Sequence, residues 1–324
     1  MKKLFSLLLV FIFIFSLSSC SSQSTQDTNE DTLNIVVTSF PAYEWTCEII
    51  GEENTDYSIT LLADGSDPHS FQPSAQDIIK ITSCDILIYT GGTSDEWIEK
   101  AIDEGENDNL HTIVLMDVLS DRLLPVEYIP GMQHDHDEHD EHDDHDGAPD
   151  EHVWLSLTNA MLCTDAITDA LCEVDENNKD TYIKNADEYK KELLSLDEQY
   201  RDMVTSSPRD TVLFSDRFPF TYLFNDYNLK YYAAFAGCSS QNEASFETVA
   251  FLNEKASELD LDVVLTIDGS DGKLAQTIVE NSVPDAKILV LNSMQTASGK
   301  DIDAGTSYID MMKENLSVLS KALS

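Results

Sequence analysis

Basic residues are scarce in this sequence. It has 19 Lys and Arg residues against 61 Asp and Glu residues, so the 324-residue chain carries a formal net charge of −42 at pH 7. Such a surface repels the phosphates of nucleic acids and the anionic headgroups of membranes. The shortage of positive charge therefore argues against nucleic acid as a partner and favours cations as ligands.

Cysteines are few, and none of them stands in a CxxC pair. Neither a disulfide framework nor a zinc ribbon is therefore indicated. We expect the cysteines beyond residue 20 to be small buried apolar residues, while one disulfide would be compatible with an oxidising compartment. They are Cys47, Cys84, Cys163, Cys172 and Cys238. The runs GxGxxG, GxxxxGK[ST] and HExxH are also missing, so nucleotide chemistry and a zinc-protease motif have no support.

The N-terminus has the pattern of a bacterial lipoprotein signal. Two lysines precede an apolar run at 4–15, which is short for a membrane span and has the length of a signal-peptide core. Residues 17–20, Leu-Ser-Ser-Cys, resemble a lipobox. The alternatives are an ordinary secretory signal and an N-terminal membrane anchor. We expect a signal peptide at 1–19, lipidation of Cys20 and a flexible tether at 20–32, which would hold the protein outside a membrane.

Apolar runs of strand length alternate with amphipathic runs of helical length in the rest of the chain. The predicted strands are 33–38, 57–62, 85–89, 112–116, 211–215, 230–235, 262–267 and 287–291. The predicted helices between them are 42–50, 74–82, 97–105, 158–172, 247–259, 273–281 and 307–323. This alternation predicts two α/β lobes with mainly parallel sheets.

One long helix is predicted between the two groups of strands. From Tyr182 to Met203 apolar residues recur at spacings of three and four, which indicates a helix of about 28 residues and about 40 Å. Such a rod would join an N-terminal lobe at 33–177 to a C-terminal lobe at 208–324, with the linker helix at 178–207. Ligands of open parallel sheets bind beyond the carboxyl ends of the strands, so facing lobes would form a binding cleft.

The segment 132–150 carries the strongest metal signal. Its central twelve residues are five histidines among seven carboxylates. Such a segment cannot bury itself, so we expect a solvated loop. Imidazole suits zinc, copper and nickel, and carboxylate suits harder ions. The loop is either an accessory collector of ions or a solvated charge run without a role. A collecting role would fade in acid as the imidazoles protonate. The histidines are His134, His136, His139, His142 and His145.

Two motifs flank this loop and, together with it, carry a family resemblance. Asp67-Pro68-His69, the His-rich loop, Glu151-His152-Val153-Trp154 and the long helix resemble the zinc- and manganese-type solute-binding lipoproteins of bacterial ABC importers. The segments 38–43 and 78–99 are also similar to that family, so the resemblance extends from Leu33 to the C-terminus. It implies two α/β lobes joined by a rigid helix, with one metal ion in the cleft between them.

The resemblance also implies a function and partners. The protein would capture Zn²⁺, or alternatively Mn²⁺, at the outer face of the cytoplasmic membrane and deliver it to an ABC permease and its ATPase. It would be a lipid-anchored monomer and not an enzyme. The abundance of histidine favours zinc, because manganese prefers oxygen donors.

By this match His69 and His152 are the metal ligands of the first lobe. The second lobe departs from the family pattern, since Ser215 and Asn292 stand where the family has a His or Glu and a carboxylate. A hydroxyl and an amide are poor zinc ligands. Nearby acids could replace them, namely Asp216, Glu243 and Asp268. Each could equally be a helix cap or a charge partner. Glu243 and Asp268 are the better placed for a cleft.

Two other functions stay open on the sequence alone. A secreted metal-dependent hydrolase could use His69 and His152 as ligands and Glu243 as a general base. The missing nucleophile and HExxH motifs, and the tether, argue against it. The altered second lobe could also serve a different ligand, such as a metal chelate.

Overall fold

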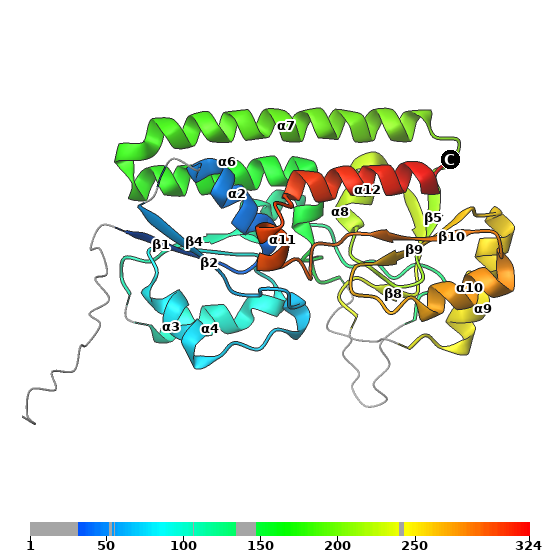
Figure 1. Cartoon of the computed structure of the whole chain (residues 1–324). Coiled ribbons are helices and arrows are strands. Elements are labelled where there is room, and N and C mark those ends of the chain that lie inside the picture. The colour runs from blue at the N-terminus through cyan, green and yellow to red at the C-terminus, as the bar shows by residue number, and fades with distance from the viewer. Residues whose placement is uncertain (1–31, 52–53, 55, 106, 134–146, 240–242) are drawn as a thin grey trace, which may run out of the picture. The chain divides into compact units, whose positions relative to one another are not determined.

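The computed structural model describes residues 32–51, 54, 56–105, 107–133, 147–239 and 243–324. The signal peptide, the lipidation expected at Cys20 and the histidines of the acidic loop lie outside the described residues. Residues 33–324 form one unit (Figure 1). Among the residues described, no helix has both the length and the apolar character that crossing a membrane requires.

The first lobe is built on a four-stranded parallel sheet. Its strands have the order β2-β1-β3-β4. They are β1 (Leu33–Val37), β2 (Tyr57–Leu61), β3 (Ile86–Tyr89) and β4 (His111–Val114). Alternate side chains of β1 enter different cores, because successive residues of a strand point to opposite faces. Ile35 and Val37 join one core, and Val36 joins the other.

Helices cover both faces of this sheet (Figure 1). On one side lie α2 (Phe40–Ile50) and α6 (Leu157–Val174), whose buried residues share the core of Ile35. On the other lie α3 (Ala75–Ser83) and α4 (Glu96–Glu104). A short helix, α5 (Leu115–Val118), follows β4 directly. Burial on both faces explains why the strands appear in the sequence as continuous apolar runs.

The second lobe also has parallel strands, arranged in pairs. The pairs are β5 (Thr211–Leu213) with β7 (Lys230–Tyr232), β6 (Arg217–Phe218) with β8 (Phe235–Ala236), and β9 (Val263–Ile267) with β10 (Lys287–Leu291). A bridge between Phe214 and Leu265 links the first pair to the last. The helices are α8 (Thr221–Tyr227), α9 (Phe246–Leu259), α10 (Lys273–Ser282), α11 (Gly299–Asp303) and α12 (Tyr308–Ala322).

Serine side chains begin four of these helices. Each accepts a hydrogen bond from the backbone N–H three residues on, which satisfies a donor that the first helical turn leaves free. They are Ser74 of α3, Ser156 of α6, Ser245 of α9 and Ser307 of α12.

The long helix is α7 (Lys179–Ser206), and its 28 residues confirm the prediction from the apolar spacing. It packs against α6 and α2 of the first lobe and against α12 and α8 of the second (Figure 1). Near its start, Asn185 donates to the carbonyl of Ile49, at 3.1 Å. Near its end, the Tyr200 hydroxyl donates to the carbonyl of Met312, at 2.6 Å. The two-lobe α/β fold expected from the sequence is confirmed, while the exact domain limits stay a prediction.

Two of the predicted strands have other limits in the structure than the apolar pattern indicates. The strand expected at 112–116 stops at Val114, because the chain turns at once into α5. The strand expected at 230–235 is divided into β7 and β8, which pair with different partners, and Ala233 and Ala234 lie between them. Apolar character shows that these residues are buried, but it does not show which strand they pair with.

Direct hydrogen bonds hold the lobes against each other. The indole N–H of Trp154 donates to the carbonyl of Ser293, at 3.0 Å, and the Tyr308 hydroxyl donates to the carbonyl of Trp154, at 2.7 Å. The backbone of Gln133 joins the edge of β8. These contacts set loops of the second lobe beside the loop that carries His152.

Candidate metal centre

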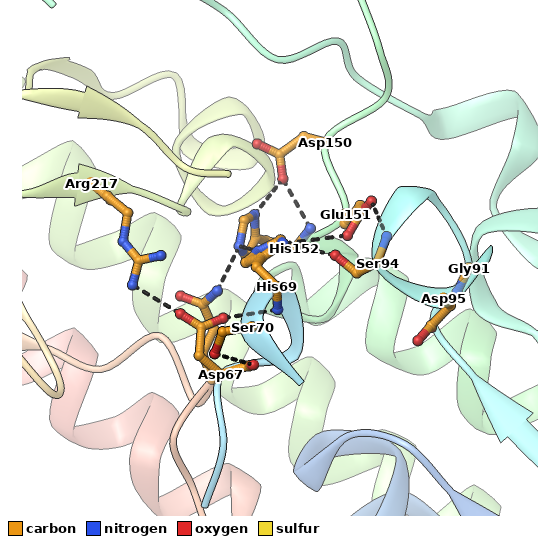
Figure 2. Close-up of polar contacts among 11 residues, drawn as sticks. Asp67, His69, Ser70, Gly91, Ser94, Asp95, Asp150, Glu151, His152 and Arg217 are labelled. Carbon is orange, nitrogen blue, oxygen red and sulfur yellow. Dashed lines mark hydrogen bonds and ion pairs between the residues drawn. The ribbon is translucent and has the colours of Figure 1, made fainter. Parts of the chain in front are cut away.

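His69 lies in a single helical turn after β2. The turn is Pro68–Ser70, and the Asp67 side chain caps it by accepting the backbone N–H of His69, at 3.0 Å (Figure 2). Proline suits the first position of such a turn because its φ is already fixed near the helical value. The Asp-Pro-His sequence thus sets the direction of the His69 ring through local bonds.

His152 is fully buried at the start of the turn Val153–Leu155. The Asp150 carboxylate accepts both the backbone N–H of His152, at 2.9 Å, and its Nδ1, at 2.8 Å (Figure 2). Because a carboxylate accepts hydrogen bonds, this network assigns the proton to Nδ1 and leaves a lone pair on Nε2. Thr221 in turn donates to the other oxygen of Asp150, at 2.8 Å.

The two rings meet although 83 positions separate them in the sequence. The Nε2 atoms of His69 and His152 are 3.1 Å apart, and the ring centroids are 5.1 Å apart (Figure 2). On its other side, the Nδ1 of His69 lies 2.8 Å from the Ser94 hydroxyl and 3.6 Å from the Glu151 carboxylate. The two Nε2 atoms therefore face each other within hydrogen-bond distance, and each ring has a polar partner at its Nδ1.

His69 is held neutral at physiological pH. Burial is the main cause, and the neighbouring His152 adds to it; together they lower the pKa of His69 to about 4, against the opposing effect of Glu151 and Asp67. A neutral imidazole keeps the lone pair that a metal ion needs. The sequence predicted both histidines as ligands. The structure brings their rings together, and their role as ligands stays a prediction.

Cys238 is the third residue of this group. One donor atom from each of His69, His152 and Cys238 lies within 4.8 Å of the others. The cysteine follows β8. Burial raises the pKa of its thiol, and the negative charges of Asp150 and Glu151 act in the same direction. The sequence predicts only an ordinary buried residue here. Its position in the loop that follows β8 is the signal that could have identified it, since a position beyond a strand also selected Asp216 and Asp268.

Ser215 and Asn292, the neutral residues that the resemblance places at ligand positions of the second lobe, have structural partners. The Ser215 hydroxyl is buried and donates to the carbonyl of Leu265, at 3.1 Å. The Asn292 side chain accepts the backbone N–H of Met294, at 2.8 Å, and its backbone bonds to the side chain of Asn315. Both residues therefore stabilise loops at the ends of strands.

The three acids predicted in the second lobe do not join the histidine pair in the part of the chain that is described. Asp216 accepts the backbone N–H of Arg217 and the hydroxyl of Thr266. Asp268 accepts the backbone N–H of Ser293 and the hydroxyl of Thr296. Glu243 is exposed. Their assignment as ligands stays a prediction, and the contacts of Asp216 and Asp268 are those of loop caps.

Two further contacts of the second lobe adjoin the histidines. The Gln295 side-chain nitrogen lies 3.0 Å from the Nε2 of His152. Arg217 forms an ion pair of 3.0 Å with Asp67 (Figure 2). Burial raises the pKa of Asp67, but Arg217 and His69 outweigh burial, so the pKa lies below its usual value. Residues from both lobes therefore surround the point where the rings meet.

A cavity of about 220 Å³ leads to this point. It is lined by His69, Ser94, Glu151 and Cys238, and also by Ala148 and Pro149, which come just after the acidic loop.

Known proteins match this chain over nearly its whole length. A family model described as "ZnuA: Zinc-uptake complex component A periplasmic" matches residues 35–322. The zinc-binding lipoprotein AdcA of Streptococcus pneumoniae (strain ATCC BAA-255 / R6) is 31% identical over 322 residues, which are 99% of this chain and 61% of AdcA. The high-affinity zinc uptake system protein ZnuA of Bacillus subtilis (strain 168) is 31% identical over 325 residues, which are 99% of this chain and 97% of that protein.

A more distant relative is named for manganese. The manganese ABC transporter substrate-binding lipoprotein scaA of Streptococcus gordonii is 26% identical over 335 residues, which are 100% of this chain and 99% of that one. Among solved structures, the Zn(II)-bound ZnuA-like domain of Streptococcus pneumoniae AdcA is similar with a TM-score of 0.71 and 28% identity. That match covers 90% of this chain and 99% of the other.

Proposed function

The chain belongs to the ZnuA family of zinc-uptake components, and from this membership we propose that it captures one Zn²⁺ ion and delivers it to an ABC permease. An ATPase would drive the import. The histidines of the first lobe, His69 and His152, hold the ion in this proposal, and residues of the second lobe complete its coordination.

The separation of the two Nε2 atoms is the observation that carries this proposal. Two nitrogens bound at about 2.0–2.1 Å to one tetrahedral zinc ion are about 3.3 Å apart. The Nε2 atoms of His69 and His152 are 3.1 Å apart. This separation matches that of two nitrogens bound to one zinc ion, which would replace the direct contact between the rings. Asp150 supports this geometry because it fixes the orientation and the proton of the His152 ring.

The donors favour zinc over manganese as the cargo. Neutral imidazole suits zinc, copper and nickel, whereas manganese prefers carboxylate, carbonyl and water oxygens. The carboxylates of Asp150 and Asp67 are engaged by other groups of the protein. Of the three relatives described above, AdcA and ZnuA are named for zinc and scaA is named for manganese.

A metal-dependent hydrolase has no support beyond the sequence pattern. The relatives are named for metal binding, uptake and transport, and the family is one of solute-binding proteins and not of enzymes. Glu243, the general base of that alternative, is exposed and bonds through its backbone carbonyl to Gln133.

We assign the protein to the outer face of the cytoplasmic membrane. The names of its relatives include lipoproteins of ABC transporters. The lipobox-like segment at 17–20 would supply a lipid anchor through Cys20, and the protein would act as a monomer. In this proposal the histidines of the acidic loop collect ions for the cleft, namely His134, His136, His139, His142 and His145.

Calorimetry on two variants tests this function. In the first variant the five loop histidines are replaced by asparagine, and we expect one tight zinc site to remain. The second adds His69→Ala and His152→Ala, and we expect that site to disappear. His111→Ala in the first variant is the matched control, because His111 is exposed and begins β4. Unchanged affinity after loss of His69 and His152 would contradict the proposal.

A further inference from the structure

We propose that Cys238 is the metal ligand that the second lobe contributes, so that one thiolate and two imidazoles hold the ion. This inference rests on the proposed function and names a donor for it. It also explains how the site can bind zinc when Ser215 and Asn292 occupy the positions at which the family has its second-lobe ligands.

The position of Cys238 carries the inference. Its sulfur lies close to a ring nitrogen of His69 and a ring nitrogen of His152. These three side chains form the one group of possible metal ligands found within the described residues. The cysteine forms no disulfide there and lines the cavity that leads to the histidines. It is therefore open to an arriving ion and lies on the second-lobe side of the site.

The residue before Cys238 has to be glycine for the loop after β8 to come this close to His152. A Cβ at Gly237 would lie 2.8 Å from the carbonyl oxygen of Phe218 and 3.1 Å from the Cε1 of His152. The missing side chain lets the loop after β8 pass close to the Cε1 edge of the His152 ring. This close passage brings the next residue, Cys238, to the metal-binding edge of that ring.

The other candidates of the second lobe are already engaged. Ser215 donates its hydroxyl to Leu265, and the Asn292 side chain accepts from Met294. Both carboxylate oxygens of Asp268 accept hydrogen bonds, from Ser293 and Thr296. Recruiting any of them would break bonds that hold a loop, whereas recruiting Cys238 requires a small shift of one side chain.

The chemistry of a thiolate fits zinc in this place. With a Zn–S bond of about 2.3 Å and Zn–N bonds of about 2.0–2.1 Å, sulfur and nitrogen ligands of one ion are about 3.6 Å apart. The donors of the group lie within 4.8 Å of each other, so a shift of roughly 1 Å brings the sulfur to bonding distance. On binding, the S–Zn bond forms and the thiol proton leaves to solvent. Thiolate also disfavours manganese.

Cobalt substitution tests the assignment on the intact protein. We expect one equivalent of Co²⁺ to give the near-ultraviolet charge-transfer absorption of a thiolate–cobalt bond. The absorption should disappear in Cys238→Ser and persist in Cys172→Ser, a half-buried cysteine of α6 that serves as control. Cys238→Ser should still bind one zinc through the histidines, with affinity lowered about 100-fold or more, since even the loss of a ligand's hydrogen-bond partner costs about 10–100-fold.

Alkylation of the unmodified protein provides a second test that does not depend on folding of a variant. Zinc at one equivalent should protect Cys238 from a maleimide, measured by mass spectrometry of its peptide, and should leave the reactivity of Cys172 unchanged. Tight binding of one ion without the absorption band, or without protection of Cys238, would overturn this inference and leave the proposed function intact. Failure of the wild-type protein to bind one ion would instead overturn the proposed function.

Discussion

The Asp150 carboxylate binds His152 twice, at its backbone N–H and at its Nδ1, over 2.9 and 2.8 Å. This pair fixes which ring nitrogen faces the cleft. We expect Asp150→Ala to lower zinc affinity about 10–100-fold, because the ring loses its orientation and its fixed proton. Asp150→Asn keeps one acceptor and should lose less. Thr221→Val is the control, since it removes a contact of Asp150 without touching His152. Competition with a chelator measures the zinc affinity. Equal zinc affinity in all three variants would refute the role of Asp150 in orienting His152.

The cleft and the acidic loop should differ in their response to acid. Burial is the main cause that lowers the pKa of His69 to about 4. An exposed imidazole protonates at about pH 6.5. Between these values protons compete with metal at the loop but only weakly at His69. Titrating the zinc-loaded protein to about pH 5.5 should therefore release loop-bound ions and retain one ion in the cleft, as measured by metal analysis after desalting. Simultaneous release of all ions would contradict the expected difference.

The same shift in pKa makes the stability of the metal-free protein depend on pH. Because the pKa of His69 is lower in the folded state than in the unfolded state, the unfolded chain binds more protons between about pH 4 and 6.5. The free energy of unfolding should therefore fall as the pH falls through this window. In His69→Gln this part of the dependence should be absent, and urea unfolding at several pH values measures it.

The ion pair between Asp67 and Arg217 should slow the release of metal. It joins the loop of His69 to β6 of the second lobe over 3.0 Å, and both side chains are mostly buried. We expect Arg217→Met to increase the rate of zinc release several-fold, in keeping with a coupling of about 1 kcal/mol for such a pair. Asp67→Asn keeps the acceptor for His69, so a double-mutant cycle isolates the pair. A coupling free energy of zero between Asp67 and Arg217 would show that this ion pair does not slow the release of zinc.

A methyl group at Gly237 should disturb the site without removing any ligand. In Gly237→Ala the new Cβ would meet the Phe218 carbonyl at 2.8 Å and the His152 ring at 3.1 Å. Contacts this short force the backbone or the ring to move, at a cost of about 1–3 kcal/mol. We expect a lower melting temperature and weaker zinc binding together. Ala236→Gly, at the neighbouring position, should change stability but leave the zinc affinity close to wild type.

Much of the fold follows from the apolar pattern. The long helix was predictable because its seam repeats without interruption from Tyr182 to Met203, and every residue of that seam except the half-buried Met203 is buried. The division of the strand at 230–235 was not predictable, since the partners of β7 and β8 are set by tertiary contacts. Strand order in the first sheet depends on the same long-range pairing.

The candidate site was predictable where a motif carried it. The motifs Asp67-Pro68-His69 and Glu151-His152 pointed to the two rings, and the structure brings these rings together. The local bond that holds His152 comes from Asp150, which precedes the motif. Cys238 belongs to no spacing pattern, and it reaches the histidines only through the path of the loop after β8. Asp216 and Asp268 follow strands as expected, but hydrogen bonds within their own loops engage them.

X-ray absorption at the zinc edge would show directly which donor atoms hold the ion. The sample would be the variant whose five loop histidines are asparagine, loaded with one equivalent of zinc. We expect imidazole nitrogens at about 2.0–2.1 Å, with the multiple scattering of two rings, and one sulfur at about 2.3 Å. A shell of oxygen atoms without imidazole scattering would contradict the proposal that His69 and His152 hold the ion.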